Sequence, residues 1–224
     1  MVFQWVECYS NQMTAIKART GRRTRRDANL EATRTHVIEA ARRLFLARGY
    51  ARATIGEIAA EAGVAVQTIY NAVGPKAAVL KLVFEATVAG PAAPRSVPEF
   101  MRERTRGASD ARGMIRLLSD WFTEVHARMA TLWQVVDEAA AHDPDLAHFE
   151  RERSLGRLQH YAEAARELKR RGGARGLALE DVAAIIFAVG HPRIHRTLVV
   201  DRGWSPERYR RWVEAALTAA LVPR

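Results

Sequence analysis

Two side-chain amides, Gln67 and Asn71, have the chemistry needed to recognise a base in nucleic acid. An amide donates one hydrogen bond and accepts another, so it can pair bidentately with adenine. A helix that buries Ile69 leaves both amides facing outward, together with Val66 and Thr68. Val66 could then contact a thymine methyl group. This is the chemistry of recognition rather than of bond making.

A second pair with a chemical spacing is His191 and His195. Four residues apart on a helix, two imidazoles can bind one metal ion. No cysteine and no acidic third ligand stands nearby at a motif spacing, and Pro192 disturbs the helix. We therefore expect a polar patch or a pocket wall here, and no metal. The other histidines considered are scattered without ligand spacing: His126, His142, His148 and His160.

Motifs of known catalytic chemistry are missing from the sequence. It contains no Gly-x-Ser-x-Gly, no phosphate-binding glycine loop and no His-Glu-x-x-His. We therefore expect no catalytic residues, no cofactor and no enzymatic activity.

The positive charge of the chain is concentrated near its N-terminus. Residues 1–80 carry a net charge of +6 and residues 81–224 a net charge of +4, out of +10 in total. A basic region attracts polyanions through counterion release and long-range steering, and nucleic acid is the usual partner. A preference for arginine in a high-GC genome would give the same excess. Charge alone therefore favours nucleic acid without deciding it.

Residues 1–33 show no helical apolar period, and we expect a basic, disordered arm that stays solvated. Such an arm could reach into a minor groove. Met13 is an alternative start, which would make part of the arm an artefact of start-codon choice. Six basic residues lie in this stretch: Lys17, Arg19, Arg22, Arg23, Arg25 and Arg26.

The sequence also predicts where the protein resides. The first ten residues have no basic region, no long apolar run and no cleavage site, so we expect no signal peptide. No stretch approaches the roughly 20 apolar residues of a membrane helix. Cys8 is the only cysteine, so no intrachain disulfide can form. We expect a cytoplasmic protein that does not contact a membrane.

The amides at 67 and 71 need a scaffold, and the residues around them predict one. An apolar stripe indicates a first helix from residue 34 to Gly49. Thr54 and Glu57 have the spacing of a capping box at the start of a short second helix. Gly63 ends that helix, and a third short helix follows up to Asn71. The stripe of the first helix consists of Val37, Ala40, Ala41, Leu44 and Phe45.

The rest of the chain is also predicted to be helical. Lys76 begins a longer helix, and residues 90–98 form a Pro- and Gly-rich linker. Two apolar stripes follow, over residues 114–125 and 129–140, and then a charged helix over about 147–171. Val182 to Val189 is apolar on all sides, as expected for a helix buried on two faces. Ser205 and Pro206 mark the start of the last helix.

Residues 49–76 resemble the DNA-binding domain of the TetR family. The family pattern runs Gly-aromatic, Thr-[Val/Ile]-x-x-Ile-Ala-x-x-Ala-Gly-Val-[Ser/Thr], and Thr-[Leu/Ile]-Tyr-x-x-Phe-x-x-Lys. The following residues of this chain stand where that pattern places them: Gly49, Tyr50, Thr54, Ile55, Ile58, Ala59, Ala62, Gly63, Val64, Thr68, Ile69, Tyr70 and Lys76. The segment from Asp201 to Tyr209 resembles the approach to the final dimerisation helix of such regulators, less specifically.

The resemblance implies roles for individual residues. It makes the segment from Val64 through Asn71 a recognition helix that enters the major groove, with Val66, Gln67, Thr68 and Asn71 facing DNA. Thr54, Tyr70 and Lys76 would hold phosphates, although Thr54 could also act as a helix cap alone and Lys76 could be a solvated charge. Two positions depart from the pattern. Ala65 replaces the usual Ser or Thr cap, and Val73 replaces the usual Phe, so the operator cannot be inferred from relatives.

The resemblance also implies an all-α fold with a three-helix, helix-turn-helix DNA-binding domain at the N-terminus. A C-terminal helical bundle for ligand binding and dimerisation would follow it. We place the arm at residues 1–33, the DNA-binding domain at 34–80 and the bundle at 81–224. The expected partners are double-stranded DNA with a palindromic operator, a second copy of the chain bound through the last two helices, and a small-molecule effector. Six residues could line the effector pocket, or could simply form core: Trp121, Phe122, His126, Trp133, Tyr161 and Phe187.

The function expected from these features is sequence-specific regulation of transcription, with repression relieved by the effector. Dimerisation would place two recognition helices about 34 Å apart, one turn of DNA. Two other interpretations stay open at this point. The chain could be a DNA-binding regulator without a ligand, which a filled core near Trp121 and Trp133 would favour. It could also be a basic helical-bundle enzyme, which titratable groups converging in a deep pocket would favour.

Overall fold

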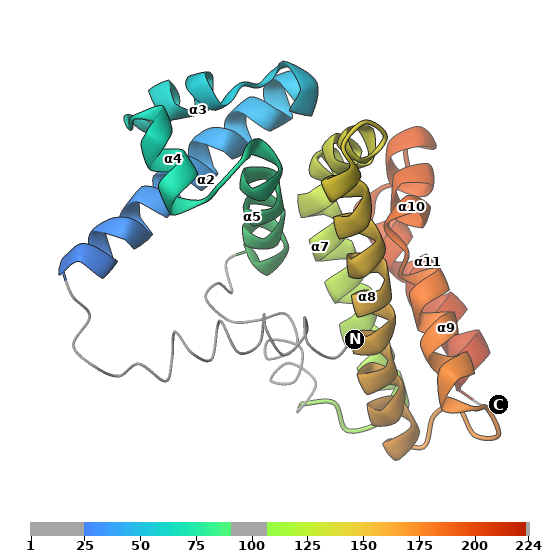
Figure 1. Cartoon of the computed structure of the whole chain (residues 1–224). Helices are drawn as coiled ribbons and strands as arrows, with labels where there is room; N and C mark the ends of the chain where they lie inside the picture. Colours follow the sequence, from blue (N-terminus) through green and yellow to red (C-terminus); the bar gives the residue numbers. More distant parts are fainter. Residues whose placement is uncertain (1–24, 91–106, 223–224) are drawn as a thin grey trace.

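The computed structural model describes residues 25–90 and 107–222 (Figure 1). These residues form helices and no strand, which confirms the all-α fold. The elements in chain order are α2 (Arg25–Arg52), α3 (Ile55–Ala62), α4 (Val66–Ala72), α5 (Lys76–Ala89), α7 (Ala111–Ala140), α8 (Pro144–Arg170), α9 (Leu179–Val189), α10 (Pro192–His195), the π-helix η2 (Arg196–Asp201) and α11 (Pro206–Leu221).

The helices form two groups (Figure 1). Helices α2 to α5 pack together, and α7 to α11 form a bundle beside them. Both α2 and α5 also pack against α7, and α5 reaches α8, so the two groups share contacts. The domain boundary placed at residue 80 stays a prediction, and it falls inside α5. Apart from Gly90, the predicted linker 90–98 lies outside the described residues.

Helix α2 begins at Arg25, upstream of the predicted start at residue 34. Among the added residues, 28–32 are exposed, so the extension leaves no apolar period in the sequence. Residues 1–24 of the predicted arm lie outside the described residues. At the other end, Gly49 has a φ of 75° and a ψ of 170°, a conformation that interrupts the helix where the sequence predicted its end.

Helix α7 is one helix of 30 residues, whereas the sequence suggested two successive stripes. No Gly or Pro separates the two stripes, and Val125, His126 and Met129 at their junction are all buried. The apolar face therefore continues without a break. Asp110 caps the helix by accepting a hydrogen bond of 2.7 Å from the amide of Gly113.

Helix α8 carries the longest polar surface of the bundle. Asp143 is its N-cap, and its Oδ1 accepts hydrogen bonds from the amides of Asp145 (3.0 Å) and Leu146 (3.3 Å). The helix ends at Arg170, just before Gly172. In the last helix, the predicted cap is confirmed, because Ser205 Oγ accepts from the amide of Arg208 at 3.2 Å.

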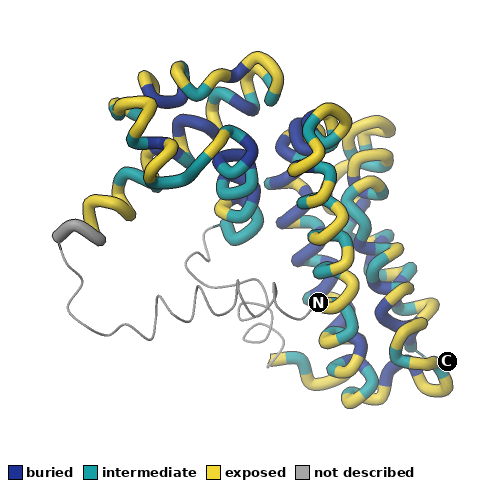
Figure 2. Tube along the Cα trace, in the orientation of Figure 1, coloured by how far each residue is buried: buried dark blue, intermediate teal, exposed yellow. Residues whose placement is uncertain are grey.

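Helix α9 is apolar on all sides from Val182 to Val189 but buries only one side within the chain. Val182, Ala183 and Ile186 are buried, whereas Ala184 and Ala188 are exposed. The expectation of burial on two faces is therefore not met by a single copy of the chain. Figure 2 shows the buried residues lining the inner sides of the helices, from α2 through to α11.

Gly190, between α9 and α10, is close against the ring of Phe122. A Cβ atom at residue 190 would lie 2.4 Å from Phe122 Cζ. The ring is fully buried and stacks on His126, with centroids 5.9 Å apart, so it has no room to withdraw. Gly156 in α8 differs, because nothing lies within 4 Å of the Cβ that it would carry.

These two glycines make a matched pair for unfolding experiments. We expect Gly190→Ala to lower the free energy of unfolding by about 1 to 3 kcal/mol, the usual cost of overpacking. Gly156→Ala should instead raise it by about 0.5 to 1 kcal/mol, because alanine is the better helix former. Urea denaturation followed by circular dichroism measures both. A Gly190→Ala protein as stable as wild type would contradict the packing described for Phe122.

Candidate nucleic-acid interface and internal pocket

Helix α3 is fixed at both ends by local hydrogen bonds. Thr54 Oγ1 accepts from the amide of Glu57 at 3.2 Å, and Glu57 Oε2 accepts from the amide of Thr54 at 2.9 Å. These bonds confirm the predicted capping box, and they lower the pKa of Glu57. At the other end, Gly63 takes the left-handed conformation, with a φ of 66°. The turn between α3 and α4 is thus set by residues within a short stretch of chain.

Helix α4 directs one residue inward and several outward. Ile69 is fully buried, whereas Val66 and Tyr70 are 43% and 48% exposed. Gln67 and Asn71 are also exposed, and Gln67 Nε2 donates to Asn71 Oδ1 at 3.0 Å. Thr68 is half-buried and so faces outward less fully than predicted. The outer face of α4 therefore presents two exposed amides joined by one hydrogen bond.

The two departures from the family pattern have visible effects on α4. Ala65 occupies the N-cap position in extended conformation, and its side chain makes no capping hydrogen bond. Val73 ends the helix and is only partly buried against the core. Helix α4 is seven residues long, and no side chain caps its N-terminus.

Lys76 is engaged within the chain in this structure. Its Nζ lies 4.2 Å from the centroid of the Tyr50 ring and donates to the carbonyl of Ala51 at 3.4 Å. Partial burial lowers the pKa of Lys76. Thr54 is exposed at the start of α3. Lys76 would have to leave the Tyr50 ring to hold a phosphate directly.

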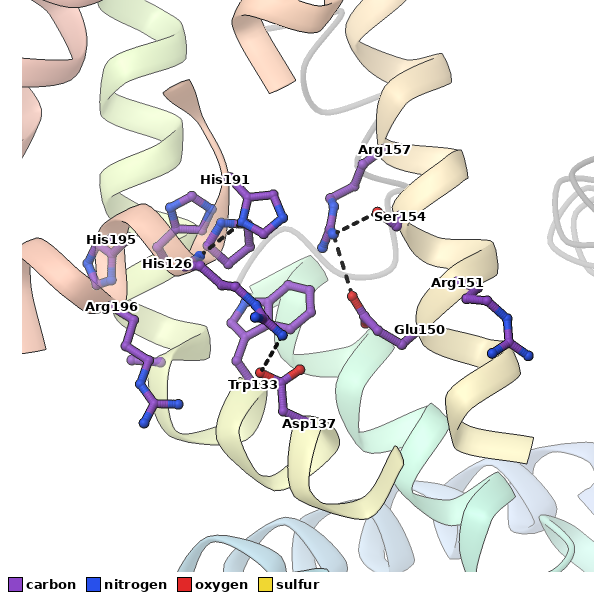
Figure 3. A pocket seen from close by; sticks show the side chains of 13 residues that line it. His126, Trp133, Asp137, Glu150, Arg151, Ser154, Arg157, His191, His195 and Arg196 are labelled. Atoms are coloured by element: carbon purple, nitrogen blue, oxygen red, sulfur yellow. Dashed lines mark hydrogen bonds and ion pairs between the residues drawn. The ribbon is translucent and has the colours of Figure 1, made fainter. Parts of the chain in front are cut away.

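A cavity of about 470 Å³ lies between α7, α8 and the segment that joins α9 to η2 (Figure 3). Of the six predicted pocket residues, His126 and Trp133 line it. Phe122, Tyr161 and Phe187 lie outside that lining and form a row of ring contacts, at 5.7 Å and 6.1 Å between successive centroids. Trp121 is buried in α7, also outside the lining.

Charged residues make up much of the cavity wall, and the sequence interpretation missed them. Asp137 comes from α7, Glu150 and Arg157 from α8, and Arg193 and Arg196 from the C-terminal segment. Glu150 and Arg157 are seven residues apart, so they lie on one face of α8. The spacing of seven between two charged residues is a signal that the sequence contains. A pattern of apolar residues does not reveal it.

His191 and His195 line this cavity, as a pocket wall would. Among the described residues, no three His, Cys, Asp or Glu side chains are grouped to hold a metal ion. The same part of the chain contains no helix that is long and apolar enough to cross a membrane.

Comparison with known proteins adds the decisive observation. Residues 37–83, from the middle of α2 to α5, match the model of the family described as bacterial regulatory proteins, tetR family. These residues form a TetR-family domain, and α3 and α4 are its helix-turn-helix. The chain is a DNA-binding transcriptional regulator. Comparison with proteins of curated function gives no match.

Solved structures show that most of the chain shares the fold of known transcriptional regulators. NalD of Pseudomonas aeruginosa, the secondary repressor of the MexAB-OprM multidrug efflux pump, is 20% identical with a TM-score of 0.65, over 86% of this chain and 98% of NalD. The complex of SmeT with triclosan is 23% identical with a TM-score of 0.65, over 86% and 92%. The fatty acid degradation regulator FadR of Bacillus halodurans is 21% identical with a TM-score of 0.61, over 82% and 93%.

The missing side-chain cap at Ala65 can be tested by adding a cap. We expect Ala65→Ser to stabilise α4 by about 1 kcal/mol, because serine Oγ can accept from an amide of the first turn. Native-state hydrogen exchange of the α4 amides should slow accordingly. The control is Ala60→Ser, since Ala60 is exposed inside α3, where a serine cannot cap. Equal exchange rates in the two variants would contradict the account of the N-cap.

Proposed function

We propose that this chain is a homodimeric repressor that leaves a palindromic operator when a small molecule enters the cavity between α7 and α8. The observation that carries the proposal is the α3–α4 unit, which directs exposed amides outward from a TetR-family domain. NalD is described as a repressor, and SmeT as bound to triclosan. Those descriptions of similar proteins support repression and effector binding here. A regulator of this kind would act in the cytoplasm, on chromosomal DNA.

In this proposal, α4 reads the operator and its neighbours hold the backbone. Gln67 and Asn71 exchange their mutual hydrogen bond for bonds to base edges, and Val66 contacts a thymine methyl group. Because both amides are already exposed and ordered, the exchange needs no movement of the helix. Thr54, Tyr70 and Lys76 hold phosphates, with Thr68 at the edge of the contact surface.

Dimerisation through α9 and α11 is supported by the outer faces of these two helices. The buried side of α11, which includes Tyr209 and Leu217, packs inside the chain. Its outer side and that of α9 are rich in small apolar residues, which let two helices approach closely. The exposed alanines are Ala184 and Ala188 on α9, and Ala215, Ala219 and Ala220 on α11. A second copy of the same face would cover this surface and pair the two DNA-binding domains.

The structure also supports a route from the cavity to the DNA-binding helices. Tyr50, at the end of α2, donates a hydrogen bond of 2.9 Å to Oδ2 of Asp143, the N-cap of α8. Arg128 of α7 donates to the carbonyls of Thr87 and Val88 in α5, both at 2.9 Å. A ligand that displaces α8 would therefore pull on α2 through Tyr50. Effector control needs this kind of contact between the two sites.

The cavity beside Trp133 favours effector control over a regulator without a ligand. A filled core at that position would have favoured a regulator without a ligand. Titratable groups do converge in the cavity, which is the sign named for the enzyme interpretation. We propose no catalytic role for them, because the TetR-family domain favours a regulator and the same groups can bind an effector.

Selection of bound sequences from a random DNA library tests the proposed function. We expect a palindrome with two half-sites about one helical turn apart. Gln67→Ala should relax the preference at one position of each half-site, whereas Lys76→Ala should weaken all sequences alike and lower the salt slope by about one. A selected pool without a shared sequence would refute operator recognition, and a shared sequence without a palindrome would refute the dimer.

Tyr50→Phe tests the route between the two groups of helices. The variant keeps the ring, so its contacts with Phe45 and Lys76 remain, but it loses the hydrogen bond to Asp143. We expect the free energy of unfolding to fall by about 1 to 2 kcal/mol, because the lost hydrogen bond has a charged acceptor. Amide exchange should speed up in both residues 45–52 and 143–150. The control is Tyr70→Phe, on exposed α4; equal effects of the two variants would refute the route.

A further inference from the structure

The cavity contains a group of buried nitrogen atoms without partners. Within the described part of the chain, four buried side-chain nitrogens accept or donate no hydrogen bond: Trp133 Nε1, Arg157 Nε, Arg157 Nη1 and His195 Nε2. All three residues line the same cavity. They come from α7, α8 and α10, which are distant in sequence, so their convergence belongs to the fold rather than to one local turn (Figure 3).

A buried donor without an acceptor costs about 1 to 3 kcal/mol, and native structures keep few of them. At least three of the four atoms are donors in any protonation state, since the indole nitrogen and the guanidinium nitrogens carry hydrogen. Several such atoms around one cavity are explained together if a bound molecule supplies the acceptors. The arrangement therefore specifies a ligand with acceptor oxygens.

The charge of the cavity wall specifies the sign of the ligand. Four arginines and two carboxylates line it, an excess of positive charge. The carboxylates are already engaged: Asp137 lies 3.9 Å from Arg193, and Glu150 is 3.1 Å from Arg153 and 3.5 Å from Arg157. A cation would have to enter against the arginines, whereas an anion would be attracted. The four arginines are Arg151, Arg157, Arg193 and Arg196.

The histidines contribute hydrogen atoms rather than charge. Burial, followed by the nearby Arg157, lowers the pKa of His191. Its Nδ1 accepts from the amide of Arg193 at 3.2 Å, so the neutral ring carries its hydrogen on Nε2. Burial also lowers the pKa of His126, whose Nδ1 lies 3.3 Å from the hydroxyl of Tyr209. Figure 3 shows His191 facing Arg157 across the cavity.

Apolar residues also line the cavity. The Arg157 guanidinium lies 4.9 Å from the centroid of the Trp133 ring and, outside the lining, 5.9 Å from that of Phe187. Ala130 and Pro192 complete the apolar side. A volume of about 470 Å³ is typical of sites for small organic molecules, which span roughly 300 to 1,000 Å³.

We propose that the effector is an organic carboxylate with a compact apolar body. Its carboxylate oxygens accept hydrogen bonds from Arg157, Trp133 Nε1 and His195, and its apolar part lies along Trp133, Ala130 and Pro192. This inference rests on the proposed function for the site, and it adds the chemical class of the molecule that the site takes.

The experiment compares carboxylates with amides of the same shape on the full-length protein. Isothermal titration calorimetry measures binding of benzoate, 2-naphthoate, 4-phenylbutyrate and decanoate, each beside its primary amide. At least one carboxylate should bind at least ten times more tightly than its amide. Arg157→Met should weaken that carboxylate at least tenfold and leave its amide unchanged. Trp133→Phe, which keeps the ring and removes Nε1, should weaken it several-fold.

The control variant is Arg166→Met, an exposed arginine on the same helix and outside the cavity, which should bind like wild type. Circular dichroism checks that each variant is folded. The proposal would be overturned if the amides bound as tightly as their carboxylates. It would also be overturned if Arg157→Met left the affinity for every carboxylate unchanged.

Operator release is measured separately with the selected DNA. A carboxylate that binds through Arg157 but leaves DNA affinity unchanged would refute effector control while supporting the ligand class. Release of DNA caused equally by amides or by cationic compounds would support effector control while refuting the proposed ligand class.

Discussion

The carboxylate of Asp143 joins two parts of this fold that are otherwise built separately. One oxygen accepts from the amides at the start of α8, and the other accepts from the hydroxyl of Tyr50. Free amides at a helix start and a partly buried hydroxyl both need an acceptor, and a single charged group satisfies both. Burial and this bond to Asp143 raise the pKa of Tyr50, so its hydroxyl stays protonated and remains a donor. The position of the DNA-binding helices relative to the bundle depends on this junction.

A second set of contacts fixes α5 between the same two groups. Arg153 of α8 lies 3.6 Å from the centroid of Phe84 and 4.5 Å from that of Trp133. Its guanidinium also bonds to Glu150, so the charge is paired and flat against aromatic rings. Trp133 thus contacts the core helix α5 on one side and the cavity on the other. The walls of the cavity are parts of the interface that holds the DNA-binding domain.

The sequence was most informative where local chemistry decides structure. The capping box at Thr54, the glycine turn at Gly63 and the cap at Ser205 involve residues a few positions apart, so their spacing predicts them. The cavity was harder to predict, because its wall combines residues from α7, α8 and α10. Trp133 and His126 were named among residues that could line a pocket, but Phe122 and Tyr161 were named with them and pack beside the cavity instead. Arg157 and Glu150 were not singled out within the charged helix, because periodicity records polarity and not surroundings. The early start of α2 was missed for a related reason, since an exposed helix has no stripe.

The layout of α8 has a consequence for how such a regulator can diversify. The junction with Tyr50 uses the N-cap, whereas Glu150, Ser154 and Arg157 face the cavity along the following turns. Replacing a cavity residue changes which molecule fits without altering the cap, and Gly156 beside them leaves open space for larger side chains. Specificity for the small molecule and attachment to the DNA-binding domain can therefore vary independently over generations, although one helix carries both.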